Sequence, residues 1–271
     1  MLRMTVSALA LALPVSAADP SVEIIAHRGA SHDAPENTVA AIKLAWEQKA
    51  DGSEFDVYLT RDGKVAVIHD KDTKRTAGEP NRVIAQSTLA ELRAMDVGRW
   101  KGEKFAGEKV PTLDEMLATV PAGKKAYVEV KCGPEIVPEL VRVLKAHELK
   151  PEQTPVISFN AQVIAAFKKA RPDVPAYWLV SLTPPKNKKK EFVPPTADEL
   201  VRKARELKAD GLDLSAADVL DEAYAKTIKA AGLKLYVWTV NDLAVARRMV
   251  KVGVDGITTD RPEWLSEQLS R

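Results

Sequence analysis

The sequence predicts an α/β fold in which eight parallel strands close into a barrel. Short apolar segments alternate with amphipathic helical segments along most of the chain, and eight such apolar segments occur. Strands that alternate with helices form parallel βαβ units, and eight units suit a (β/α)8 TIM barrel. The length of 271 residues fits one such barrel, which commonly takes about 250 residues. A doubly wound open sheet is the alternative, but no G-x-G-x-x-G motif follows the first strand.

The predicted strands are evenly spread, with one exception. They cover residues 22–26, 53–59, 126–130, 155–159, 176–180, 209–214, 234–240 and 254–259. Between most of them lie helical patterns such as "NTVAAIKLAWEQ" and "NDLAVARRMVKV". The connection from His69 to Thr112 is too long for this pattern and holds one helix-like piece, "STLAELRAM". We interpret about residues 70–111 as a small insertion after the second strand that caps the barrel mouth, where functional loops gather.

The N-terminus has the features of a secretory signal peptide. Arg3 precedes an apolar run, and the small residues of "VSA" favour cleavage after Ala17 or Ala18. The run is shorter than the roughly 20 residues that span a bilayer. We therefore expect residues 1–18 to be a signal peptide and 19–271 to form a single domain. The protein would be exported, periplasmic or secreted, without stable membrane insertion.

Charge and cysteine content exclude some classes of protein. Lys and Arg total 40 against 38 for Asp and Glu, a net charge of +2, which is too balanced to indicate nucleic-acid binding. The single cysteine, Cys132, allows no internal disulfide. We interpret it as a small buried side chain rather than a nucleophile, because no base is placed for it.

Acidic side chains occupy alternate positions on two predicted strands. Glu54 and Asp56 share one face of the strand at 53–59, and Glu129 shares a face with Lys131. A parallel strand in a barrel buries both faces. If the apolar partners pack on helices, the three carboxylates face the barrel axis and converge. Three oxygen donors favour one hard divalent cation, Ca²⁺ or Mg²⁺. Zinc fits less well, since no H-x-H or H-E-x-x-H motif is present.

Further polar residues come at the ends of the predicted strands, where barrels place their active groups. Arg28 and Lys131 bring fixed positive charge, so a phosphate group is the expected ligand. His27 and His69 can exchange protons near neutral pH. Trp238 ends the seventh strand. Taken singly, each residue has an ordinary structural explanation, but their occurrence at successive strand ends favours a catalytic site.

Several motifs resemble those of the glycerophosphodiester phosphodiesterase family. They are "HRGASHDAPENT", "EFDVYLTRDGKVAVIHD", "VPTLDEML", "VEVK", "ISFN", "YVWTVN" and "GVDGITTDRP", which span the mature chain in order. The resemblance implies a metal-dependent barrel enzyme that hydrolyses glycerophosphodiesters to an alcohol and sn-glycerol 3-phosphate. It also implies roles for eight residues: His27 and His69 as the acid–base pair, Arg28 and Lys131 on the phosphate, Trp238 beside the glycerol, and Glu54, Asp56 and Glu129 on the metal.

The mechanism implied by this resemblance has two stages. The free glycerol hydroxyl attacks phosphorus and releases the alcohol, and water then opens the cyclic phosphate. We favour His27 as base and His69 as acid in the first stage. The alternatives are a lysophospholipase D-like or other phosphodiesterase on the same barrel, and a non-catalytic glycerophosphodiester-binding protein. The expected partner is a small-molecule phosphodiester substrate, and the protein would be a monomer or homodimer.

Four other polar residues receive structural interpretations from the sequence. Glu36 and Asn37 are interpreted as a loop clamp at the barrel mouth, with Glu36 as a candidate neighbour of the metal ligands. Asp70 either orients His69 or forms a turn. Asp260 is interpreted as a turn or cap residue.

Overall fold

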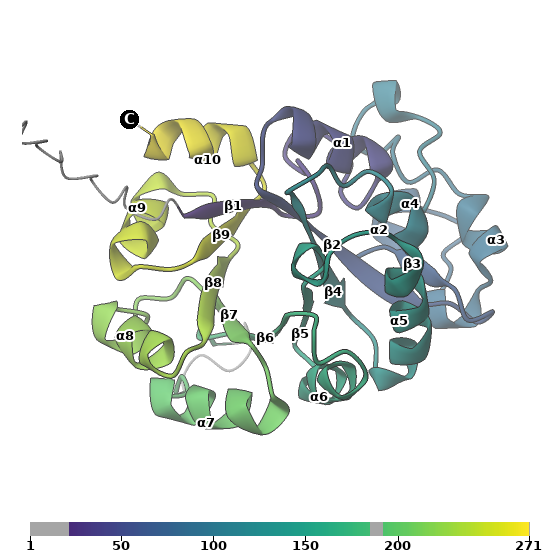
Figure 1. Cartoon of the computed structure of the whole chain (residues 1–271). Coiled ribbons are helices and arrows are strands. Elements are labelled where there is room, and N and C mark those ends of the chain that lie inside the picture. Colours follow the sequence, from purple (N-terminus) through teal and green to yellow (C-terminus); the bar gives the residue numbers. More distant parts are fainter. Residues whose placement is uncertain (1–21, 185–191, 271) are drawn as a thin grey trace, which may run out of the picture.

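The computed structural model describes residues 22–184 and 192–270 and contains a closed barrel of eight parallel strands (Figure 1). Neighbouring strands follow the order β1-β9-β8-β7-β6-β5-β4-β2, and β1 also pairs with β2, which closes the ring. The barrel strands are β1 Glu23–Ala26, β2 Gly52–Leu59, β4 Lys125–Val130, β5 Val156–Ser158, β6 Ala176–Val180, β7 Gly211–Ser215, β8 Lys234–Trp238 and β9 Gly256–Thr259. The predicted (β/α)8 barrel is confirmed, and the open sheet is wrong. The predicted signal peptide lies outside the described residues.

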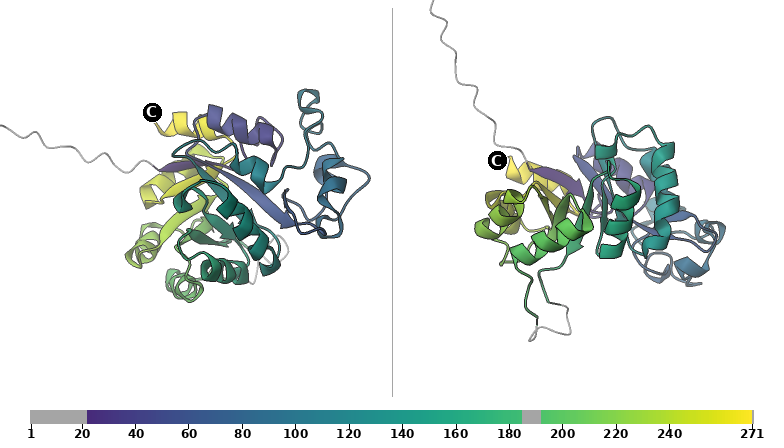
Figure 2. Two further views of the ribbon diagram at one scale, coloured as in Figure 1. Left: turned by 45° about the vertical axis from the view of Figure 1, so that its right-hand side comes forward. Right: turned by 60° about the horizontal axis from the view of Figure 1, so that its bottom comes forward.

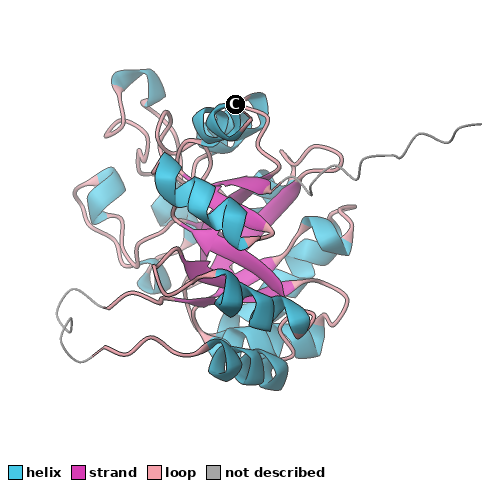
Figure 3. Ribbon diagram, turned by 90° about the vertical axis from the view of Figure 1, so that its left-hand side faces the viewer, coloured by secondary structure: helices cyan, strands magenta, loops and turns pink. Residues whose placement is uncertain are grey.

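Helices surround the barrel on its outer side (Figure 3). They are α1 Val39–Glu47, α4 Leu113–Leu117, α5 Val137–Ala146, α6 Ala161–Ala170, α7 Ala197–Leu207, α8 Glu222–Ala230, α9 Leu243–Val252 and α10 Pro262–Leu269. Side chains that cap free backbone N–H groups begin many of them. Thr38, for example, accepts from Ala41 N at the start of α1. Within the described ranges, no helix is long and apolar enough to cross a bilayer.

Alternate residues of each barrel strand face two different cores. On β2, Phe55 and Val57 are fully buried in the large cluster beneath the helices. The side chains between them point to the barrel interior. The lower part of that interior is filled by tyrosines, with ring centroids 5.6 Å apart for Tyr127–Tyr236 and 4.8 Å for Tyr177–Tyr236. The residues predicted for the site lie above these tyrosines, toward the carboxyl ends of the strands.

A separate small unit follows β2 (Figure 2). Strand β3, Val65–Val67, pairs antiparallel with β2 and leads into α2 (Lys74–Ala77), α3 (Leu89–Arg93) and two short 3-10 helices at Ile84–Gln86 and Glu103–Phe105. Helix α3 lies within the predicted "STLAELRAM" piece, and a Thr88–Glu91 capping box begins it. The unit has its own apolar cluster, made by Ala66, Ile68, Ile84, Leu92, Val97 and Val110. Its residues lie beside the barrel and contact the mouth through polar side chains.

Candidate active site

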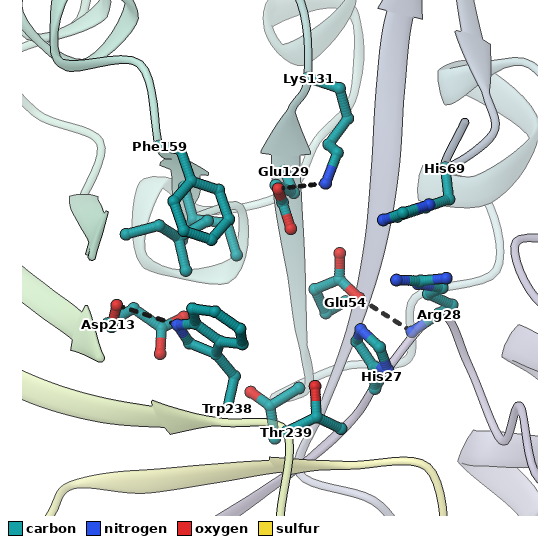
Figure 4. A pocket seen from close by; sticks show the side chains of 13 residues that line it. His27, Arg28, Glu54, His69, Glu129, Lys131, Phe159, Asp213, Trp238 and Thr239 are labelled. Carbon is teal, nitrogen blue, oxygen red and sulfur yellow. Dashed lines mark hydrogen bonds and ion pairs between the residues drawn. The ribbon is translucent and has the colours of Figure 1, made fainter. Parts of the chain in front are cut away.

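A cavity of about 110 Å³ lies at the carboxyl ends of the barrel strands (Figure 4). It is lined by His27, Arg28, Glu54, His69, Glu129, Lys131, Ile157, Phe159, Leu179, Asp213, Trp238, Thr239 and Thr258. Seven of the eight residues predicted for the site are among these. The eighth, Asp56, is 1% exposed and lies behind the lining, in contact with Arg28 and Lys131. The structure thus brings all eight together.

Three carboxylates meet within the cavity wall. Glu54, Asp56 and Glu129 each offer an oxygen, and these atoms lie within 4.8 Å of one another. Two of the oxygens, Glu54 Oε1 and Asp56 Oδ1, are buried and have no hydrogen-bond partner in the described part of the chain. Buried polar atoms are rarely left without a partner. A cation held by all three side chains would satisfy them.

The three acids do not share negative charge equally. Burial, followed by repulsion from Asp56, raises the pKa of Glu129 to about 7. Burial, followed by repulsion from Asp56 and Glu129, raises the pKa of Glu54 well above its ordinary value, although Arg28 opposes this. Burial also acts to raise the pKa of Asp56, but Lys131 and Arg28 outweigh it and lower the pKa. A divalent cation between them would let all three ionise.

The backbone around Arg28 brings its guanidinium and amide to the acids. Arg28 has a left-handed φ of 55°, which is uncommon outside glycine and frequent at functional sites. Its N–H donates to Glu54 Oε2 at 2.9 Å. Gly29 follows with φ of 81°, and a Cβ there would come within 2.6 Å of the backbone of Ala41. The H-R-G motif therefore needs its glycine to hold Arg28 in place.

Lys131 supplies the second fixed positive charge. Its Nζ donates to Glu129 Oε1 at 2.7 Å and lies 3.4 Å from Asp56 Oδ1. The same ammonium lies 5.9 Å from the ring centre of Phe159, within the range of a cation–π contact. Lys131 is thus placed at the edge of the cavity between the acids and an aromatic wall.

Both histidines are oriented by an aspartate. His27 Nδ1 lies 2.6 Å from Asp260 Oδ1, and His69 Nδ1 lies 2.7 Å from Asp70 Oδ1. A carboxylate accepts from the Nδ1 proton, so Nε2 is the nitrogen left for proton exchange. Burial lowers the pKa of His69, although Asp56 opposes this. Of the two interpretations of Asp70, the structure supports orientation of His69.

Asp260 is a residue whose contact the sequence interpretation missed. Burial acts to raise its pKa, but hydrogen bonds from His27, Asn241 and Ser31 bring the pKa to about 2. It directly follows the last barrel strand, β9. The rule that selected the other site residues, position at a strand end, would have selected Asp260 as well.

A chain of ion pairs joins the insertion to the barrel mouth. Arg75 on α2 donates to both oxygens of Glu36, at 2.7 and 2.8 Å, and to Asp70 Oδ2 at 2.6 Å. Glu36 also accepts from Arg28 Nη1 at 2.9 Å. The predicted clamp role of Glu36 therefore has a partner, Arg75, that the sequence did not single out, and the chain links Arg28 to His69.

Asn37 fixes the position of Asp56. Its Nδ2 donates to Asp56 Oδ2 at 2.8 Å, and its Oδ1 accepts from Asp56 N at 3.0 Å. Asn37 is buried and has a left-handed φ of 57°, a conformation that asparagine tolerates better than most residues. The "PENT" loop thus clamps β2 as well as the mouth.

The other side of the cavity is largely apolar. Trp238 packs edge-to-face on Phe159, with ring centroids 5.3 Å apart, and its Nε1 donates to the backbone carbonyl of Asp213 at 3.1 Å. The Asp213 carboxyl lines the cavity, and burial followed by the charge of Glu129 raises its pKa well above the ordinary value. Asp213 was not predicted as a site residue, because "GLDL" has the pattern of an ordinary buried strand.

One side of the cavity thus attracts an anion and can move protons, while the other suits a short carbon chain. Arg28, Lys131 and a cation on the acids would neutralise phosphoryl oxygens, and the two histidine Nε2 atoms can serve as base and acid. The fold and the site define a hydrolase that acts on phosphoric esters at the mouth of a (β/α)8 barrel.

Comparison with known proteins gives the particular family. Residues 27–264 match the model of the glycerophosphoryl diester phosphodiesterase family. The chain belongs to this family and is an enzyme of the same type.

Individual relatives match over nearly their full length. A glycerophosphodiester phosphodiesterase of Caldanaerobacter subterraneus is 36% identical over 89% of this chain and 95% of that protein. One of Bacillus subtilis is 30% identical over 92% of this chain and 89% of that protein. A phosphodiesterase of Oleispira antarctica, solved with the product sn-glycerol-3-phosphate, superposes with a TM-score of 0.79 at 30% identity, covering 92% of this chain and 97% of that one.

Proposed function

We propose that the chain hydrolyses glycerophosphodiesters, such as glycerophosphocholine and glycerophosphoethanolamine, to an alcohol and sn-glycerol 3-phosphate. The observation that carries this proposal is the geometry of one small cavity. It holds two aspartate-oriented histidines, Arg28, Lys131 and part of a three-carboxylate cluster. The Oleispira antarctica phosphodiesterase of similar fold was solved with sn-glycerol-3-phosphate, which supports the same product here.

Glu54, Asp56 and Glu129 would hold one divalent cation, Ca²⁺ or Mg²⁺. The residues fit such an ion because all three donors are carboxylate oxygens and two of the oxygens are buried without a hydrogen-bond partner in the described residues. Oxygen-only donor sets favour these hard cations over zinc. The bound cation would supply Lewis-acid stabilisation of the phosphoryl oxygens.

The chain's own residues account for the proton transfers. In the first step, His27 Nε2 takes the proton of the glycerol hydroxyl that attacks phosphorus, and His69 Nε2 gives a proton to the departing alkoxide. In the second step, His69 takes a proton from water as it opens the cyclic phosphate, and His27 returns its proton to the ring oxygen. Arg28 and Lys131 stabilise charge on the phosphoryl oxygens throughout. The attacking hydroxyl is part of the substrate, which keeps its entropic cost small.

The test is a coupled assay of glycerol 3-phosphate release across several head groups, with and without a chelator. We expect turnover that stops on chelation and returns with Ca²⁺ or Mg²⁺. Glu54→Ala and His27→Ala should abolish turnover, and His147→Ala is the matched control because His147 lies at the end of α5, outside the cavity lining. Unchanged turnover in the two site variants would refute the proposal. Faster release of choline from lysophospholipids would favour the lipid alternative, and binding without turnover would favour a binding protein.

We also propose that the protein is exported and that its signal peptide, residues 1–18, is removed by cleavage after Ala17 or Ala18. The support is the sequence pattern alone, a basic residue followed by an apolar run and small residues. N-terminal sequencing of the protein recovered outside the cytoplasm should begin at Ala18 or Asp19. A protein that keeps Met1 and stays in the cytoplasm would contradict export.

A further inference from the structure

Asp213 is a buried acid that the proposed chemistry does not use. It lies on β7 between Leu212 and Leu214, which pack in the cluster beneath the helices. Alternation along the strand therefore turns Asp213 to the barrel interior, where it lines the cavity. The residue is 3% exposed. Its Oδ1 has no hydrogen-bond partner among residues 22–184 and 192–270.

The surrounding residues give Asp213 no structural purpose. It is outside the group of carboxylates that could share a cation, which contains only Glu54, Asp56 and Glu129 in the described chain. The positively charged side chains that line the same cavity bond to other acids, Arg28 to Glu36 and Lys131 to Glu129. A buried carboxyl without a partner destabilises the fold. A hydrogen bond from a ligand bound in the cavity would satisfy it.

The position of Asp213 indicates which part of a ligand it meets. In the barrel order, β7 lies across from β2, which carries Glu54 and Asp56. Figure 4 shows Asp213 and Trp238 on one side of the cavity and Arg28 and His69 on the other. Phosphate belongs near the positive groups, because a further carboxyl would repel it. An anionic group is therefore excluded at Asp213, and a hydroxyl that a short carbon chain along Trp238 connects to the phosphate fits this position.

We propose that Asp213 recognises the terminal hydroxyl of the glycerol moiety, the one that does not attack phosphorus. This inference rests on the proposed hydrolysis of glycerophosphodiesters. A hydroxyl both donates and accepts, so the carboxyl can bind it in either protonation state. A site built to bond a substrate hydroxyl discriminates strongly against an analogue that lacks it, because the buried partner is then left unpaired. Asp213 would thus select glycerol over smaller diols.

Two chromogenic substrates isolate this hydroxyl. Glyceryl p-nitrophenyl phosphate and 2-hydroxypropyl p-nitrophenyl phosphate both keep the attacking hydroxyl, and only the first has the terminal one. We expect the wild type to prefer the glyceryl substrate by at least about tenfold in kcat/KM. Asp213→Leu should reduce that preference to about twofold or less, mainly through a higher KM for the glyceryl substrate. Asp213→Asn, which can still bond a hydroxyl, should retain part of it.

Several outcomes would overturn the inference. One is a wild type that does not prefer the glyceryl substrate. Another is an equal loss of kcat/KM on both substrates in Asp213→Leu, which would indicate a purely structural role. Asp218→Leu, at a fully exposed acid beyond the same strand, is the control and should keep the preference.

Calorimetric binding of sn-glycerol 3-phosphate and of propane-1,2-diol 1-phosphate separates this inference from the proposed function. Selective binding of the first without any turnover would refute hydrolysis and keep the role of Asp213. Turnover of glycerophosphodiesters together with equal binding of the two phosphates would support hydrolysis and refute the role of Asp213.

Discussion

His27 and His69 are oriented alike, each through Nδ1, but they are proposed to serve different oxygens. A p-nitrophenolate leaves without a proton, whereas the choline alkoxide needs one. We therefore expect His69→Ala to lower turnover of glycerophosphocholine by roughly 10²- to 10⁴-fold and to keep most of the rate at which the first p-nitrophenolate leaves glyceryl p-nitrophenyl phosphate. His27→Ala should lose both activities. Single-turnover rates of leaving-group release on the two substrates make the comparison, because ring opening needs His69 on both, and the opposite pattern would exchange the two roles.

Asp260 is predicted to position His27 rather than to touch the substrate. Asp260→Asn replaces a carboxylate that receives three side-chain hydrogen bonds, from His27, Ser31 and Asn241. We expect kcat to fall roughly 10²-fold while KM changes little, because a misoriented imidazole weakens proton transfer more than binding.

The matched control for this prediction is Asp242→Asn. Asp242 caps α9, and asparagine caps a helix equally well, so activity should be retained. A rise in KM with unchanged kcat in Asp260→Asn would instead indicate a role in substrate binding.

At the scale of single residues, the sequence predicted side chains that follow a charge pattern and missed those defined only by three-dimensional contact. Glu54 and Asp56 alternate with apolar residues, so strand geometry sufficed to turn them inward. Asp213 also alternates with leucines, but a single acid in "GLDL" gives no sign of a partner across the barrel. Asn37 was assigned to a clamp, and its bond to Asp56 depends on how the loop folds over β2.

Among the elements, the barrel strands were predictable, whereas most of the short helices inside the insertion were not. All eight predicted strands overlap an observed strand, because apolar runs bounded by helical patterns are a strong local signal. In the insertion, short helices pack around a few apolar residues such as Ile84 and Leu92. Short pieces of this kind have little periodicity, so only α3 was found in advance.

Helix α2 has four residues, yet it carries the side chain that connects the insertion to the site. Arg75 makes two bonds to Glu36 and one to Asp70, and the contact with Glu36 raises the pKa of Arg75. A lysine cannot reproduce this planar, forked pattern. We expect Arg75→Lys to lower kcat by about tenfold or more, because Asp70 and Glu36 then hold His69 and Arg28 less firmly.

The control for Arg75 lies in the same insertion. Arg82 makes a looser contact with Glu91, at 3.7 Å, so Arg82→Lys should leave kcat unchanged. Thermal melting of both variants tests for general damage. Equal losses of kcat in the two variants would mean that the insertion acts only through its overall stability.

In the molecule as a whole, the lower part of the barrel interior is packed with aromatic rings and the upper part contains the candidate active site. Tyrosines fill its lower part, whereas the upper part contains three acids that repel each other. The folded chain therefore carries an electrostatic penalty at the site, which cation binding would remove. Global stability and site occupancy should be linked for this reason.

This linkage has a predictable pH dependence. In the folded chain the pKa of Glu129 is raised to about 7, by burial first and then by Asp56, from an ordinary 4.5. Between these values the folded state holds a proton that the unfolded state has lost, so this group destabilises the cation-free protein progressively as pH rises from 4.5 through 7. Below pH 7 a cation must also displace that proton. We expect Ca²⁺ or Mg²⁺ to raise Tm more at pH 8 than at pH 6, and Glu129→Gln to flatten the difference. Calorimetric melts of chelated and cation-loaded protein at the two pH values make the test, and an equal rise in Tm at both would contradict it.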